Sequence, residues 1–191
     1  MTVTGLSAPF QPYYCEENAW HAAKQAVEAG ERGPIHVVFL SNAARSCAVW
    51  AQRASPRPGE PIVWDYHVVL RVGGEIRDPD CRAGARLPAA VWLAASFPHG
   101  WTIFARYLPM FRCISADRFL ESFASDRRHM RRANGRYLQP PPAWPPIVAP
   151  DGRAHTLPAF LDFESNEVGA WMDLRQFAEA MRGTDPCPST P

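Results

Sequence analysis

A cysteine near the N-terminus, and a histidine followed by two aspartates, are the residues whose types and spacing could do chemistry. Cys15 follows a proline-containing segment and begins a stretch with apolar residues at helical spacing, which ends at Gly30. A thiol at a helix N-terminus lies near unpaired backbone N–H groups and the positive end of the helix dipole, which favour the thiolate. Glu16 and Glu17 act in the opposite direction if their carboxylates point at the sulfur. The pattern therefore predicts a cysteine nucleophile that needs a cationic partner.

The expected partner is a histidine in the segment from Pro61 to Val72, which is rich in β-branched and aromatic residues and predicts a strand. Because side chains alternate along a strand, Asp65, His67 and Val69 share one face. The other face takes apolar residues, namely Ile62, Trp64, Tyr66, Val68 and Leu70.

A return strand brings two acids to this histidine. Gly73-Gly74 predicts a two-residue turn, and the chain then runs back through Asp78 to Asp80. With that turn His67 lies directly opposite Asp80 and diagonal to Asp78, and both acids share its face. Pro79 cannot donate to the ladder, so the pairing is expected to fray there. The register leaves both acids open as partners of His67, and a three-residue loop would move both to the far face.

Several motifs, in this order along the chain, resemble those of the protein N-terminal glutamine amidohydrolase family. They are Tyr-Cys-Glu-Glu-Asn at 14–18, Trp-Asp-Tyr-His-Val-Val at 64–69, Asp-Pro-Asp at 78–80, Phe-Ala-Ser-Asp-Arg-Arg-His-Met at 123–130, the prolines at 140–142, and Gly-Ala-Trp at 169–171 with the residues up to 177. The resemblance covers roughly residues 14–183, although the loop before Asp78 is short and residues 88–110 match loosely.

The resemblance implies a cysteine hydrolase of the α/β (α+β) class, with a papain- and transglutaminase-like fold in which helices flank a mainly antiparallel sheet. It implies Cys15 as the nucleophile, His67 as the base and Asp78, the first acid of the pair, as the residue that orients His67. This choice differs from the simplest hairpin register, and Asp80 is kept as a supporting residue. The implied reaction converts an N-terminal glutamine to glutamate and releases ammonia through a cysteine thioester, without a cofactor.

A reaction at a chain N-terminus requires an acceptor for the α-ammonium group. Asp65, on the face of His67, is the expected acceptor, and Glu17 is the alternative. Two other functions stay open. One is a transglutaminase-like or peptidase-like cysteine acyl transferase, and the other is a catalytically silent module that binds peptide N-termini.

Composition restricts the class of protein. The 191 residues fit a single catalytic domain, with residues 1–12 and 184–191 expected to be flexible tails. The formal charge of +1 gives no overall field that attracts nucleic acid or a membrane. The resemblance implies proteins or peptides with N-terminal glutamine as the partners, and the chain is expected to be a monomer. Five cysteines without a C-x-x-C pair, and no apolar run of signal-peptide or membrane-spanning length, predict a cytoplasmic protein with reduced thiols.

The other expected elements follow from local patterns. Helices are predicted at 15–29, 89–97, 117–132 and 174–182, strands at 35–40 and 46–50, a hairpin at 62–78 and extended polyproline at 140–150. Cys47 and Cys113 lie in apolar runs and are expected in the core, whereas Cys81 could be exposed.

The basic run from Arg127 to Arg136 is predicted to be a solvated helix face rather than a binding surface. Ser125-Asp126, just before it, either caps that helix or supports the active site. The remaining histidines are scattered along the sequence, so no metal site is expected. They are His21, His36, His99, His129 and His155.

Overall fold

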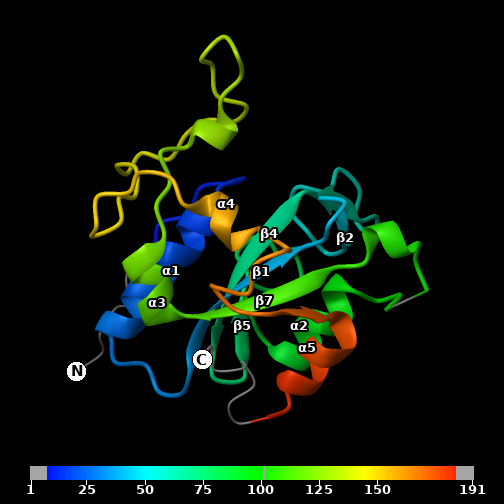
Figure 1. The fold of residues 1–191 in the computed structure, drawn as a ribbon. Helices are drawn as coiled ribbons and strands as arrows, with labels where there is room; N and C mark the ends of the chain where they lie inside the picture. Colours follow the sequence, from blue (N-terminus) through cyan, green and yellow to red (C-terminus); the bar gives the residue numbers. More distant parts are fainter. Residues whose placement is uncertain (1–7, 101, 184–191) are drawn as a thin grey trace.

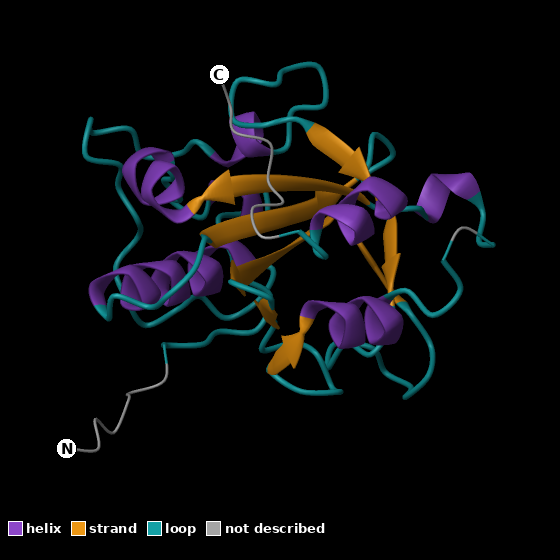
Figure 2. Cartoon of the chain, turned by 90° about the horizontal axis from the view of Figure 1, so that it is seen from below, coloured by secondary structure: helices purple, strands orange, loops and turns teal. Residues whose placement is uncertain are grey.

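An antiparallel sheet with helices on both faces forms the centre of the structure (Figure 1; Figure 2). The computed structural model describes residues 8–100 and 102–183. Within these residues the sheet has six strands in the order β6-β5-β4-β1-β7-β8, and β2 and β3 form a separate pair. The strands are β1 Ile35–Ser41, β2 Cys47–Val49, β3 Ile62–Trp64, β4 Tyr66–Val72, β5 Glu75–Arg77, β6 Arg86–Pro88, β7 Met110–Ser115 and β8 Trp171–Asp173. The expected α/β class with a mainly antiparallel sheet is confirmed.

The helices divide between the two faces because alternate residues of each strand point to opposite sides. Val37 and Phe39 of β1 join the core under α1, α3 and α4, whereas Val38 and Leu40 join the core under α2 and α5. The helices are α1 Cys15–Glu28, α2 Ala89–Ser96, η1 Ala105–Tyr107, α3 Ala116–Ser122, η2 Arg128–Met130, α4 Leu157–Phe160 and α5 Leu174–Ala180. None of the described helices has the length and apolar composition needed to cross a membrane.

The predicted hairpin register is confirmed. Val72 pairs with Glu75 across the Gly73-Gly74 turn, where Gly73 has a φ of +56° that glycine adopts without strain. The pairing ends at Arg77, just before the Asp78–Asp80 segment that contains Pro79. The two acids therefore follow the strand instead of continuing it.

The predicted strand over 61–72 is interrupted at Asp65. Residues before it form β3, which pairs with β2 outside the main sheet, and residues after it form β4. The alternation holds within β4, since Tyr66 packs under α1 and Val69 packs on the opposite face. It fails at Trp64, whose ring stacks on His67 with centroids 5.9 Å apart. The prediction that Trp64 lies on the opposite face was wrong, because the break resets the alternation.

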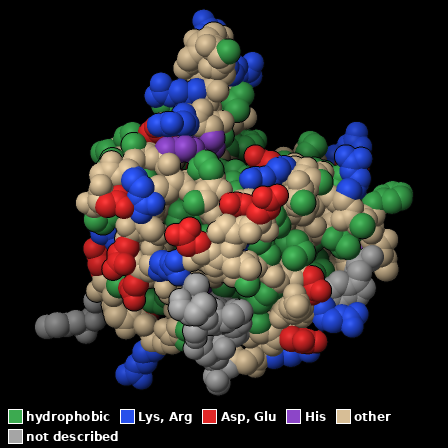
Figure 3. All heavy atoms as spheres, in the orientation of Figure 1, with side chains coloured by type: hydrophobic (Ala, Val, Ile, Leu, Met, Phe, Trp, Pro, Cys, Tyr) green, Lys and Arg blue, Asp and Glu red, His purple; other side chains and the backbone are tan. Residues whose placement is uncertain are grey.

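The predicted helix over 117–132 is wrong beyond Ser122. Phe123 has extended backbone and is fully buried, and Ser125 then forms a bridge with Ile147. Residues 128–140 leave the body of the molecule as a projecting arm (Figure 1), whereas Phe123 and Ile147, before and after it, belong to the core under α1. Figure 3 shows arginine side chains gathered on this projection and histidine side chains where it joins the body.

The basic run is not one solvated face. Arg127 is only 4% exposed and has a left-handed backbone, whereas Arg131, Arg132 and Arg136 are exposed on the arm. The ion pair that buries Arg127 is made with a residue of α1, which local sequence does not reveal.

The cysteine predictions are partly confirmed. Cys47 and Cys113 lie in the core as expected. Cys81 is also fully buried, so the idea that it is exposed was wrong. It forms an isolated bridge with Gln52, which brings the acid segment against the loop after β2.

Candidate active site

A cavity of about 480 Å³ lies where the N-terminus of α1 meets β4 and the arm. Cys15, His67 and Asp80 contribute to its wall, as do Asp65 and Tyr66 at the start of β4. The arm closes the other side with residues that include His129, Met130, Leu138 and Gln139. The fold therefore brings Cys15, Asp65, His67 and Asp80 to one cavity, whereas Asp78 is not part of its lining.

Cys15 is the first residue of α1 and is 9% exposed. The preceding Tyr14 provides no side-chain hydrogen bond to the helix N-terminus, so the first N–H groups are not capped by it. The thiol donates to Glu16 Oε2 at 3.6 Å, and the backbone of Val68 also hydrogen-bonds the sulfur.

Of the two opposing effects expected on the Cys15 thiol, the one that raises its pKa prevails in this structure. Burial raises the pKa of Cys15 well above its ordinary value, and the carboxylates of Glu16, Asp80 and Asp65 raise it further. The backbone hydrogen bond from Val68 acts in the opposite direction but does not overcome them. Glu16 thus points at the sulfur, the orientation that favours the protonated thiol.

His67 bonds to Asp78 and not to Asp80. Its Nε2 atom lies 3.1 Å from Asp78 Oδ1, and both side chains are almost completely buried. Burial alone would lower the pKa of His67, but the charge and hydrogen bond of Asp78, together with the charges of Asp80 and Glu16, raise it. The arrangement stabilises the imidazolium form.

Asp78 accepts four hydrogen bonds. Oδ1 accepts from His67 Nε2 and from the backbone N–H of Asp80. Oδ2 accepts from Gln52 Nε2 at 3.1 Å and from Trp92 Nε1 at 3.0 Å. Burial favours the neutral acid, but the charge of His67 and these hydrogen bonds lower the pKa of Asp78 below its ordinary value. Asp78 is therefore a charged and fixed acceptor. Sequence reasoning missed Gln52 and Trp92, which carry no recognisable motif.

Asp80 lines the cavity beside this pair. One ligand atom each from His67, Asp78 and Asp80 lies within 4.8 Å of the others, a grouping that could hold a metal ion. Both Asp78 oxygens, however, already accept N–H groups, which occupy lone pairs that a cation would need. Burial raises the pKa of Asp80, partly offset by His67. The donors around Asp78 favour an acid that orients His67 over a metal ligand.

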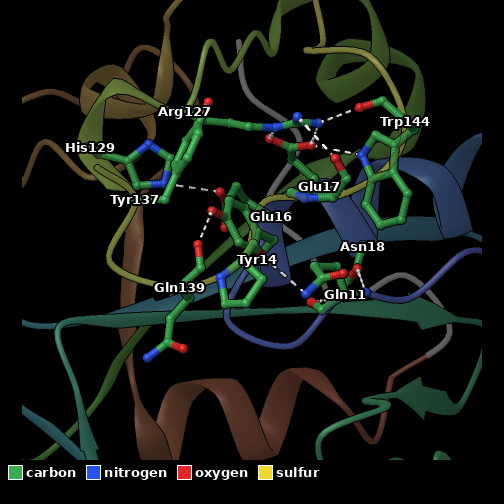
Figure 4. A network of polar contacts seen from close by, with 12 residues as sticks. Gln11, Tyr14, Glu16, Glu17, Asn18, Arg127, His129, Tyr137, Gln139 and Trp144 are labelled. Carbon is green, nitrogen blue, oxygen red and sulfur yellow. Dashed lines mark hydrogen bonds and ion pairs between the residues drawn. The ribbon is translucent and has the colours of Figure 1, made fainter. Parts of the chain in front are cut away.

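The two carboxylates considered for the α-ammonium group differ in position. Asp65 is exposed on the cavity wall, and its Oδ1 accepts the backbone N–H of Tyr66. Glu17 is fully buried and does not line the cavity. Its oxygens take Arg127 Nε and Nη2 at 2.9 and 2.8 Å and Trp144 Nε1 at 2.7 Å (Figure 4). Glu17 therefore anchors the arm to α1 and is not available to a substrate.

Two histidines described as scattered in the sequence meet on the arm side of the cavity. The rings of His129 and His155 stack with centroids 5.9 Å apart. His129 Nε2 lies 3.1 Å from Glu16 Oε1, and His155 Nδ1 lies 3.6 Å from Asp126 Oδ1. Asp126 thus supports the cavity wall instead of capping a long helix, and the resemblance around 123–130 was the one signal for this wall.

Comparisons with known proteins point to one family. The family model described as N-terminal glutamine amidase matches residues 10–181. A protein N-terminal glutamine amidohydrolase of Arabidopsis thaliana is 34% identical over 173 residues, which cover 85% of this chain and 78% of the relative. The Bos taurus protein of the same name is 35% identical over 148 residues (73% and 70%). That of Drosophila pseudoobscura pseudoobscura is 31% identical over 172 residues (86% and 83%).

Proposed function

The chain belongs to the N-terminal glutamine amidase family, and we propose from this premise that it hydrolyses the side-chain amide of an N-terminal glutamine to glutamate and ammonia through a thioester on Cys15. The observation that carries the mechanism is the buried His67–Asp78 pair, whose His67 lines the same cavity as the thiol at the start of α1. The reaction is an amide hydrolysis on proteins or peptides, and it needs no cofactor.

The first half of the reaction forms the acyl-enzyme. His67 takes the thiol proton, Cys15 Sγ attacks the amide carbon, and the imidazolium gives the proton to the leaving nitrogen, which departs as ammonia. Because Asp78 holds Nε2, Nδ1 is the nitrogen that exchanges this proton. The raised pKa of His67 supports the imidazolium form that the step requires.

The second half hydrolyses the thioester. His67 takes a proton from water, the hydroxide adds to the γ-carbonyl carbon, and the C–S bond breaks with return of the proton to the sulfur. Asp78 holds the imidazole in one tautomer and stabilises its charged form throughout. The oxyanion in both halves is stabilised by backbone N–H groups at the start of α1, including that of Cys15.

The α-ammonium group of the substrate needs an anionic acceptor. Asp65 is one candidate, because it lines the cavity within the same wall as Cys15 and His67. Its exposure lets an incoming N-terminus reach it without a rearrangement.

We also infer a papain- and transglutaminase-like fold, with one catalytic domain that acts as a cytoplasmic monomer. The order of a helix-borne cysteine, then a strand-borne histidine and then its acid, across one antiparallel sheet, supports the fold. Cys15, Cys47 and Cys81 form no disulfide, which is typical of a reducing compartment.

The test is ammonia release from short peptides. We expect ammonia from Gln-Gly, but not from Gly-Gln-Gly or Asn-Gly. Release from internal glutamine, or transfer to an added amine in preference to water, would favour a transglutaminase-like enzyme. Cleavage of the peptide bond would favour a peptidase. Binding of Gln-Gly without turnover would leave a silent N-terminus binding module.

A further inference from the structure

Two adjacent glutamates at the start of α1 are both fully buried but have different surroundings (Figure 4). Glu17 has a complete counterion, the guanidinium of Arg127, which itself is 5% exposed. Within residues 8–100 and 102–183, no arginine or lysine forms an ion pair with Glu16. A buried carboxylate without a matched cation is costly and needs a reason.

The contacts of Glu16 leave one oxygen unsatisfied. Oε2 accepts from the hydroxyl of Tyr66 at 3.1 Å and from the Cys15 thiol. Oε1 lies 3.1 Å from His129 Nε2, but the ring is not aligned for a hydrogen bond, and both His129 nitrogens also have no hydrogen-bond partner. Glu16 itself is fully buried and, like Glu17, is not part of the cavity lining, but the three residues around its carboxylate, Cys15, Tyr66 and His129, all line the cavity. An unsatisfied buried acceptor beside a cavity indicates a missing polar ligand.

We propose that Glu16 binds the α-ammonium group of the N-terminal glutamine and that His129, whose Nε2 lies 3.1 Å from Oε1, must move aside for it. The inference rests on the proposed function and names the residue that makes the reaction specific for a chain N-terminus. His129 is a positioning residue here, since it is 18% exposed and lies between the cavity and Oε1.

The spacing suits a glutamine whose amide carbon is under attack. Four bonds of about 1.5 Å separate that carbon from the α-nitrogen, so the two atoms are at most about 5 Å apart. The amide carbon would lie about 3–3.5 Å from Cys15 Sγ before attack. Glu16 Oε2 is 3.6 Å from the same sulfur. A bent glutamine side chain therefore brings its ammonium group to Glu16 while its amide stays at the thiol.

Glu16 suits this role better than Asp65. Asp65 is exposed to solvent, where an ion pair contributes little, and Tyr66 N–H already occupies one of its oxygens. Glu16 is shielded from water, where the same charge pair is stronger. Glu16 would therefore discriminate more strongly than Asp65 against a glutamine that has no free α-ammonium group.

Occupation of Glu16 also affects the nucleophile. The Glu16 carboxylate is one cause of the raised pKa of Cys15, after burial. An ammonium group beside Glu16 offsets that negative charge and favours the thiolate. The N-terminus of the substrate thus helps to ionise the thiol that attacks its side chain.

The test is a cycle between a protein change and a substrate change at pH 7, where the α-amine is largely protonated. Gln-Gly is compared with the same compound lacking the α-amine, 4-carbamoylbutanoyl-glycine, on wild type and Glu16→Gln. For wild type we expect removal of the amine to lower kcat/KM on the order of a hundredfold. Glu16→Gln should lower kcat/KM for Gln-Gly by a similar factor. On the amine-free substrate, Glu16→Gln and wild type should have the same kcat/KM.

Matched variants separate the alternatives. Glu28→Gln removes an exposed carboxylate from the same helix and should leave both substrates unaffected. Equal losses of kcat/KM on both substrates in Glu16→Gln would assign Glu16 a structural role and overturn the proposal. A loss of kcat/KM in Asp65→Asn that is confined to the substrate with the amine would assign the ammonium group to Asp65 and also overturn it. No ammonia from Gln-Gly with wild type would instead refute the proposed function.

A second measurement does not depend on the folding of Glu16→Gln. In a crystal structure of Cys15→Ala with bound Gln-Gly, we expect the α-nitrogen within about 2.7–2.9 Å of a Glu16 oxygen, with His129 rotated from its present position. An α-nitrogen bound by Asp65 with His129 unmoved would contradict the proposal.

Discussion

Replacement of Asp78 by asparagine tests the His67 pair without changing its size. Gln52 and Trp92 both donate to Oδ2, so the carbonyl oxygen of the new amide must take that position. Its NH₂ group then replaces Oδ1 and meets two donors, His67 Nε2 and the backbone N–H of Asp80. His67 can relieve the clash only by presenting an unprotonated Nε2, which moves its proton to Nδ1, the nitrogen that must accept from Cys15.

The expected loss in kcat is about 10⁴-fold, the size of the same wrong-tautomer change in a serine protease, or about 5 kcal/mol of barrier. The unpaired Asp80 N–H adds a loss of about 1–3 kcal/mol in folding stability. Asp80→Asn changes a side chain that does not bond to His67, so we expect a milder effect on kcat. Ammonia release from Gln-Gly measures both. A variant Asp78→Asn that keeps a tenth of the wild-type kcat would refute the tautomer argument.

The same variant has a predicted pH signature. Because folding lowers the pKa of Asp78, its carboxylate stabilises the fold above pH 3.8, the ordinary pKa of the group. This stabilisation is lost as the pH falls through the lowered pKa of the folded state. Because folding raises the pKa of His67, its imidazolium stabilises the fold below pH 6.5, the ordinary pKa of histidine. This stabilisation is lost as the pH rises through the raised pKa of the folded state. The difference in Tm between wild type and Asp78→Asn should therefore be largest between these pH limits. A difference that does not depend on pH would contradict the ion pair.

Three further predictions follow from the site. Cys15→Ala should keep the wild-type Tm but less than about one per cent of the ammonia release, and a higher residual rate would remove Cys15 from the chemistry. Because the pKa of Cys15 is raised, its reaction with iodoacetamide in the free protein should be slower at pH 7 than that of a small thiol. The rate should increase above pH about 8.5, and a fast rate that is constant from pH 6 would contradict the raised pKa. Arg127→Met leaves Glu17 buried without its cation and should lower the free energy of unfolding in urea by about 3–5 kcal/mol, whereas the exposed Arg132→Met should change it little; equal values would exclude a structural role for the pair.

Features set by neighbouring residues were predictable from the sequence. The Gly73-Gly74 turn fixes the register of β4 and β5, and the apolar spacing after Cys15 marks α1. The choice of Asp78 over Asp80 required the family resemblance, because the plain register brought Asp80 opposite His67. Pro79 follows directly after Asp78, where the strand pairing has ended, and the chain then leaves the ladder.

Features set by distant contacts were not predictable. The pair of Glu17 and Arg127 spans 110 residues, and burial of Arg127 requires the backbone to leave the helix after Ser122. Glu16 and His129 are similarly remote in sequence, so neither the orientation of Glu16 toward the thiol nor the wall of the cavity follows from spacing. The direction of the thiol pKa was not predictable for the same reason, since the sequence shows Glu16 next to Cys15 but not that its carboxylate turns toward the sulfur or that Asp65 and Asp80 lie near it.

The most direct test of the central claim is detection of the covalent intermediate. Wild-type protein is quenched with acid during turnover of Gln-Gly and digested, and the peptide that contains Cys15 is examined by mass spectrometry. We predict a thioester between Cys15 and the side-chain γ-carbonyl of Glu-Gly that disappears when the substrate is exhausted and is absent in Cys15→Ala. Ammonia release with Cys15 unmodified at every quench time, and undiminished in Cys15→Ala, would contradict nucleophilic catalysis by this thiol.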